Sequence, residues 1–171
     1  LDAMPKHEYD PAQGFAGSPY QPDQSKRTTI YPAKLAEYGR QYGDVADFSG
    51  RSVEELQREL LSGNPVVVYV TLWWAEPYYR TYRMGDHEET LLRNNHAVLL
   101  CGYDSQTDQY NVADPYNVKC QGQDYFYWQD ASVLEPLYLV RQHAVVTFFP
   151  ARFSPSFPSG QYPGHRKRWE K

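Results

Sequence analysis

Two short apolar runs, at residues 65–72 and 96–103, constrain the fold of this 171-residue chain more than any other feature. Both are rich in valine or leucine and are apolar on both faces, which is typical of strands buried in the centre of a sheet. They are too short to cross a membrane as helices. Because 41% of the residues are hydrophobic, a chain of this length can bury one core.

Further strands are predicted on the C-terminal side of these runs. A polar turn at 104–108 joins the second run to an antiparallel partner at 109–114. Pro115 ends that partner, because proline cannot donate to a strand ladder. Residues 143–149 supply a last apolar strand. We therefore expect an antiparallel sheet of at least four strands.

Helices are predicted mostly before the sheet, which makes the fold class α+β. An apolar stripe at 31–42 indicates the first helix, with Gly43 as its C-terminal stop. A capping box opens a second helix at 52–63. A helix or irregular turn is expected at 129–138, broken by Pro136.

The chain length suits one domain, which we place at residues 1–149. Within it, residues 1–30 are rich in Pro, Gly, Asp and Gln and predict an extended arm. Residues 73–95 form a connection of unusual length, which is either a functional loop or contains a short element. The Pro-rich segment 150–171, with its basic run at 165–168, is expected to be a flexible tail.

Charge and cysteine content exclude several classes of protein. The net charge of −4 does not provide the basic face that nucleic-acid binding requires. Two cysteines, Cys101 and Cys120, are too few for a disulfide framework or a four-cysteine zinc site, although one bridge between them stays open. The first residues lack the basic head and apolar run of a secretory signal.

A metal site is not favoured either. His87, Glu88, Glu89 and His96 are ligand types, but their spacing differs from the His-Glu-x-x-His pattern that places two histidines on one helix face. We therefore expect neither a metal ion nor another cofactor.

The pair that carries chemistry is His96, at the start of one predicted strand, and Asp114, at the end of the next. Side chains alternate between the two faces of a sheet, so the pair can meet only in some registers. If opposed residue numbers sum to 210 the two are direct neighbours, and if they sum to 212 they are diagonal. An imidazole held by a carboxylate is the orienting half of a nucleophile–base–orienter set, although the spacing alone favours a structural hydrogen bond within the core.

The sequence resembles the papain-like cysteine peptidases related to bacteriocin-processing (double-glycine leader) peptidases, and more closely their secreted bacterial relatives. The resemblance lies in Asn-Pro-Val-Val-Val-Tyr-Val-Thr at 64–71, Asn-His-Ala-Val-Leu-Leu-Cys-Gly-Tyr-Asp at 95–104 and Tyr-Asn-Val-Ala-Asp-Pro at 110–115. It covers roughly residues 4–148 and includes the segment 13–20. It implies a papain-like fold in which His96 is the general base and Asp114 orients it.

The same resemblance implies a nucleophilic cysteine at the start of an N-terminal helix, shortly after an oxyanion-hole glutamine. No cysteine precedes Cys101, so the helical N-terminal part of the fold is expected to be incomplete. Cys101 lies an odd number of residues from His96 and is expected to be a small buried residue on the opposite face. Cys120 has no reason to meet His96. We therefore expect this chain to be inactive alone.

Three explanations for the absent nucleophile stay open. The chain is a fragment, which a start at Leu1 favours, or a pseudoenzyme that keeps the fold for binding, or a partner chain supplies the helix. In the fragment and partner cases, an uncovered sheet face predicts a dimer or a partner chain that covers it.

The expected function is thiol-mediated peptide or amide hydrolysis in the complete protein, with a peptide or protein as substrate. The alternative is a non-catalytic module that binds an extended peptide or a cell-surface glycan. Trp73, Trp74 and Tyr78 are the candidates for substrate binding, since aromatic side chains offer a large contact area, and covering the sheet edge explains them equally well. By resemblance, the protein is expected to be secreted or on the bacterial cell surface.

Overall fold

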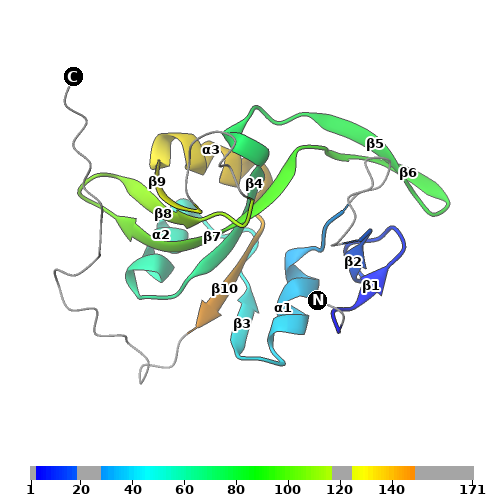
Figure 1. The fold of residues 1–171 in the computed structure, drawn as a ribbon, viewed down its shortest axis with the longest axis horizontal. Coiled ribbons are helices and arrows are strands. Elements are labelled where there is room, and N and C mark those ends of the chain that lie inside the picture. The colour runs from blue at the N-terminus through cyan, green and yellow to red at the C-terminus, as the bar shows by residue number, and fades with distance from the viewer. Residues whose placement is uncertain (1–2, 19–27, 117–124, 149–171) are drawn as a thin grey trace.

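The computed structural model describes residues 3–18, 28–116 and 125–148. Its centre is a six-stranded antiparallel sheet with the strand order β3-β10-β4-β7-β8-β9 (Figure 1). The strands are β3 (Asp44–Asp47), β4 (Val66–Thr71), β7 (Asn95–Asp104), β8 (Gln109–Ala113), β9 (Phe126–Asp130) and β10 (Ala144–Phe148). The two apolar runs of the sequence are the adjacent central strands β4 and β7, so their prediction is confirmed.

One face of the sheet is covered by two helices, α2 (Val53–Leu61) and α3 (Ala131–Arg141). Alternate side chains of the central strands point to this face and form a core with the apolar sides of both helices. The most buried members of this core are Leu56, Val66, Val68, Leu100, Val112 and Leu134. The capping box at Ser52 begins α2 as predicted, with the Ser52 side chain accepting from the backbone N–H of Glu55. We call this the covered face.

The opposite face is only partly covered. Helix α1 (Pro32–Gly39) packs against β3 and β10 at one edge, where Gly39 lies against the side chain of Val45. The end of the arm closes the next part, because the buried Tyr69 donates a hydrogen bond to the carbonyl of Ile30 at 2.7 Å. Beyond Tyr69, no described element lies over β4, β7, β8 and β9 on this side, which we call the open face.

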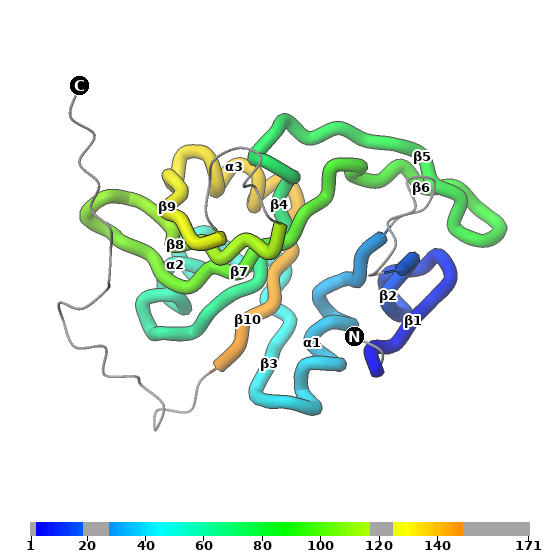
Figure 2. The backbone as a smooth tube through the Cα atoms, viewed as in Figure 1, coloured from blue at the N-terminus to red at the C-terminus, as the bar shows by residue number. Residues whose placement is uncertain are grey.

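A separate hairpin extends away from the sheet, between β4 and β7 in the chain (Figure 2). It consists of β5 (Tyr79–Met84) and β6 (His87–Leu92), and a short 3-10 turn, η1 (Leu72–Trp74), precedes it. The arm contributes two short strands, β1 (Lys6–His7) and β2 (Phe15–Ala16), which lie beside the hairpin in both ribbon and tube. Tyr9 of the arm packs against Gly85 at the hairpin turn, so the two segments stabilise each other.

Several element boundaries differ from prediction for local reasons. Helix α1 ends at Gly39 because the next residues tighten into a turn, in which the Tyr42 N–H bonds to the Gly39 carbonyl. Pro136 does not break α3, whose apolar positions pack into the core on both sides of it. The long connection at 73–95 contains the hairpin.

The predicted tail at 150–171 and Cys120 lie outside the described residues. In the part of the chain that is described, no helix has the length and apolarity needed to cross a membrane.

Candidate active site

His96 and Asp114 are in contact, as the predicted register allows. The His96 Nε2 lies 2.7 Å from the Asp114 Oδ1. Leu99 lies opposite Ala113 and Leu100 opposite Val112, so the opposed numbers sum to 212 and the pair is diagonal across β7 and β8. Both side chains are largely buried, with 13% of the His96 side chain and 7% of the Asp114 side chain exposed.

This contact determines which ring nitrogen of His96 can accept a proton. The Asp114 carboxylate accepts from Nε2–H, so the neutral imidazole carries its proton there. Nδ1 makes no hydrogen bond with any residue that the structure describes. It is therefore the nitrogen that can take a proton from an incoming group.

The Asp114 carboxylate is itself held at both oxygens. Its Oδ1 also accepts from the backbone N–H of Tyr116 at 2.8 Å, and its Oδ2 accepts from the Tyr127 hydroxyl at 3.2 Å. The Asp114 N–H donates to the Tyr125 carbonyl at 2.8 Å, which joins the end of β8 to β9. Burial and the charge of Asp114 raise the pKa of Tyr127 above its ordinary value, so the phenol stays a donor.

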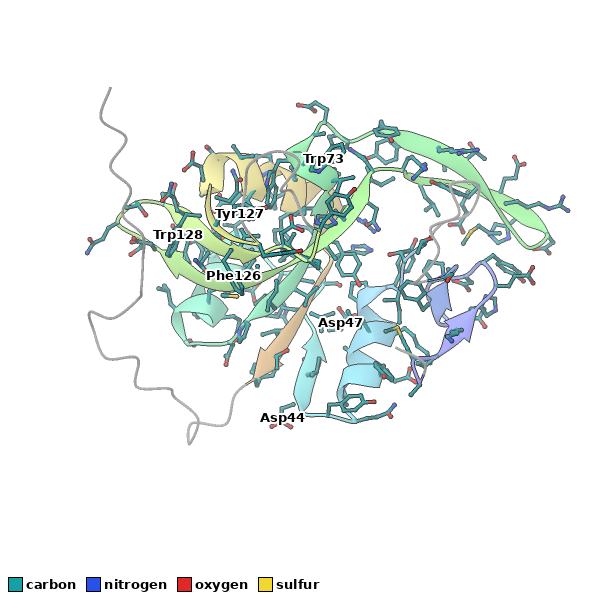
Figure 3. All side chains as sticks on the ribbon, viewed as in Figure 1. Asp44, Asp47, Trp73, Phe126, Tyr127 and Trp128 are labelled. Carbon is teal, nitrogen blue, oxygen red and sulfur yellow. The ribbon has the colours of Figure 1, made fainter. Side chains whose placement is uncertain are left out.

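Tyr116 and Tyr127 are site residues that the sequence analysis did not identify. Tyr127 lies in the Phe-Tyr-Trp segment of β9, which is labelled in Figure 3. The sequence patterns predict no strand at this segment. The clustered aromatic residues at 125–128 were the available signal for a strand there. Without β9, nothing placed a third side chain beside Asp114.

The three predicted substrate-binding residues lie in different environments. Trp73 is 48% exposed, and its ring packs edge-on against Tyr116, which in turn packs edge-on against His96. Trp74 turns inward, where it packs against the core and its ring lies edge-on to the Tyr127 ring. Tyr78 is exposed at the base of the hairpin, where its backbone N–H bonds to the Asn94 side chain. The structure therefore does not bring these residues together on one surface.

A strained turn separates the two indoles. Trp73 and Trp74 have φ values of 58° and 56°, in the left-handed region that non-glycine residues seldom adopt. Across this turn the two side chains diverge: Trp73 is exposed and contacts Tyr116, whereas Trp74 packs against the core and contacts Tyr127.

Cys101 is exposed, so the prediction that it is a small buried residue is wrong. The reason is a β-bulge between Leu100 and Gly102, which takes Cys101 out of the regular alternation of β7. Five residues of strand separate it from His96, a distance of roughly 16 Å at about 3.3 Å per residue. Partial burial raises the pKa of its thiol, which disfavours the nucleophilic thiolate.

An apolar groove of about 480 Å³ lies on the open face, the side of the sheet opposite to the His96–Asp114 contact. Its floor is formed by side chains of β4, β7 and β8, and its far wall by Tyr125 and Phe126 before and at the start of β9. Asp114 and Pro115 close one end, but His96 does not line it. The groove is an apolar part of the sheet surface that no described element covers.

The residues of metal-ligand type noted in the sequence do not gather around an ion site among the described residues. His87 lies between Asp86 and Glu89 at 3.2 and 3.1 Å on the exposed hairpin, away from His96. Among the residues that the structure describes, no three His, Cys, Asp or Glu side chains are placed to hold a metal ion.

Comparison with known proteins gives one family and one fold. The model of a family described as "Peptidase_C39 like family" matches residues 1–136. A crystal structure from Bacillus anthracis, described as a "putative C39-like peptidase", superposes with a TM-score of 0.71 at 20% identity, over 87% of this chain and 77% of that chain. No curated protein matches the sequence significantly. The predicted α+β, papain-like fold is confirmed by this likeness and by the six-stranded sheet.

Proposed function

We propose that this chain, which belongs to the Peptidase_C39 like family, carries the general base and its orienting carboxylate for thiol-dependent hydrolysis of peptide bonds. The chain is a cysteine peptidase-like domain by family and by fold. The observation that supports the finer proposal is the 2.7 Å contact between His96 Nε2 and Asp114 Oδ1.

In the proposed reaction, Nδ1 of His96 takes the proton of a cysteine thiol as the sulfur attacks the scissile carbonyl carbon. The imidazolium then gives that proton to the departing amine nitrogen, and the acyl-enzyme thioester is hydrolysed by a water molecule that His96 deprotonates. Asp114 keeps Nε2–H directed away from the reacting atoms and stabilises the imidazolium in both steps.

The nucleophile in this proposal is not Cys101. Its position on the bulge, roughly 16 Å along the strand from His96, is too far for proton transfer. Its thiol pKa is raised by burial, which is the opposite of what a nucleophile requires. In this proposal neither Cys101 nor Cys120 is the nucleophile, and the thiol is supplied by another segment of the same protein or by a partner chain.

Two measurements test the proposal. N-terminal and intact-mass determination of the natural protein will show whether a thiol-bearing segment belongs to it. In that protein, His96→Gln should abolish peptide hydrolysis, whereas Cys101→Ser should leave it unchanged. Hydrolysis by the present chain that survives replacement of both Cys101 and Cys120 would contradict the mechanism.

A non-catalytic binding module is the second candidate. It is favoured by the exposed aromatic rings of Trp73 and Tyr116, which pack against each other, and by the contact of Tyr116 with His96. Fluorescence titration of the chain with extended peptides distinguishes the two. Binding that Trp73→Ala removes, in a natural protein that has no further cysteine, would favour the module over the enzyme.

A further inference from the structure

We infer that Tyr127 is a positioning residue that locks the Asp114 carboxylate in the orientation in which it accepts from His96. This inference rests on the proposed function of the His96–Asp114 pair. It adds a third side chain to that pair, from a strand that the sequence analysis did not identify.

The first argument is the register of three adjacent strands. In the β7–β8 register, His96 is a diagonal neighbour of Asp114 from one side. In the β8–β9 register, Val112 lies opposite Tyr127, which makes Tyr127 the diagonal neighbour of Asp114 from the other side. All three side chains therefore lie on the same face, with the carboxylate between an imidazole and a phenol.

The second argument is how the two carboxylate oxygens are shared. His96 Nε2–H and the Tyr116 N–H both donate to Oδ1, so they alone leave Oδ2 without a described protein donor. The Tyr127 hydroxyl donates to Oδ2 at 3.2 Å. Because Asp114 is only 6% exposed, water cannot readily replace that donor. Removing it leaves a buried oxygen unsatisfied and frees the carboxylate to rotate.

The third argument is that the Tyr127 ring is itself held in place by packing against Trp74. The Trp74 ring packs edge-on against the Tyr127 ring, with 6.5 Å between the two ring centroids. The left-handed backbone at Trp73 and Trp74 directs Trp74 to this place. Thus Trp74 acts on the pair through Tyr127.

The test is the exchange of the His96 Nε2–H proton with solvent, measured by NMR on the full chain labelled with ¹⁵N-histidine. His96→Gln assigns the signal among the five histidines. Tyr127→Phe should accelerate exchange about fivefold, the effect expected from loss of one hydrogen bond. Trp74→Phe should accelerate it less, and Asp114→Asn should remove the protected signal.

Tyr103→Phe is the matched control, because the Tyr103 hydroxyl donates to Asp108 at 2.7 Å at the far end of the same sheet. It should leave His96 exchange unchanged. Unchanged exchange in folded Tyr127→Phe would overturn the inference, and if that variant does not fold, unchanged exchange in Trp74→Phe would do so. The readout does not need peptidase activity, so failure of the proposed function, seen as hydrolysis that survives His96→Gln, is a separate result.

Discussion

The central strands β4 and β7 direct apolar side chains to both faces of the sheet, but the two faces differ in what covers them. On the covered face, Val66, Val68 and Leu100 are completely buried beneath α2 and α3. On the open face, their immediate neighbours Val67 and Leu99 line a groove with no described element above them. The difference shows that an apolar run on both faces predicts a central strand without predicting that both faces are covered.

The His96–Asp114 pair belongs to the covered face, at its end near α3 and η1. Its neighbours there, Trp74 and Tyr127, pack against the core. The side chains that position the pair therefore belong to the packing that stabilises the fold. The open face carries the groove and no side chain that contacts the pair in the part of the chain that is described. Variants with a substitution on only one face can show how much each face contributes to the stability and self-association of the chain.

The largest expected effect comes from one pair of adjacent residues. Leu100→Ala should lower the free energy of unfolding by about 3 kcal/mol, because it leaves a cavity in the covered core. Leu99→Ala removes the same atoms from the half-exposed groove and should cost about 1 kcal/mol or less. Urea denaturation measures both. Equal losses would mean that the open face is covered in solution.

A smaller loss is expected where α2 begins over the covered face. Ser52→Ala removes the side-chain acceptor of the Glu55 N–H and should lower the free energy of unfolding by about 1 kcal/mol. Ser62→Ala at the other end of α2 is the control, and its effect should be within about 0.5 kcal/mol, since that exposed residue caps no N-terminal donor. The same urea titration applies. A larger loss at Ser62 would contradict this account of the cap.

Much of the covered face could be predicted from the sequence because its signals are local. The capping box at Ser52, the turn at 104–108 and the length of the β4 run each specify one element without reference to the rest of the chain. The contact between His96 and Asp114 could be predicted as well, because a two-strand register is determined by a short turn.

The remaining features depend on tertiary context. β3 and β9 are edge strands whose residues alternate weakly, so only their pairing with β10 and β8 defines them. The bulge at Cys101 interrupts the odd–even alternation of β7, so counting residues from His96 does not place its side chain. Trp73 and Trp74 were grouped with Tyr78 by residue type, and the left-handed turn that separates the indoles carries no glycine or asparagine to reveal it.

A substitution on the open face should change self-association of the chain while changing its free energy of unfolding very little. Phe126 is 66% exposed at the wall of the groove. If the open face is an association surface, Phe126→Ser should reduce any concentration-dependent increase in sedimentation coefficient, while the free energy of unfolding stays within about 0.5 kcal/mol. Tyr42→Ser is the control, because Tyr42 is 72% exposed but lies after α1, outside the groove. A cleanly monomeric chain at all concentrations would contradict the expected dimer.

The smallest expected effect concerns the Cys101 thiol, which is exposed yet not activated. Because its pKa is raised, less thiolate is present at a given pH than in the unfolded chain, and the alkylation rate should begin to rise only at higher pH. Iodoacetamide labelling across pH, with Cys120→Ser to leave one thiol, compares the folded chain with the chain in urea. Faster labelling of the folded chain would show an activated thiol and would restore Cys101 as a candidate nucleophile. Slower labelling would instead mean that the Cys101 thiol is accessible to solvent without being chemically activated.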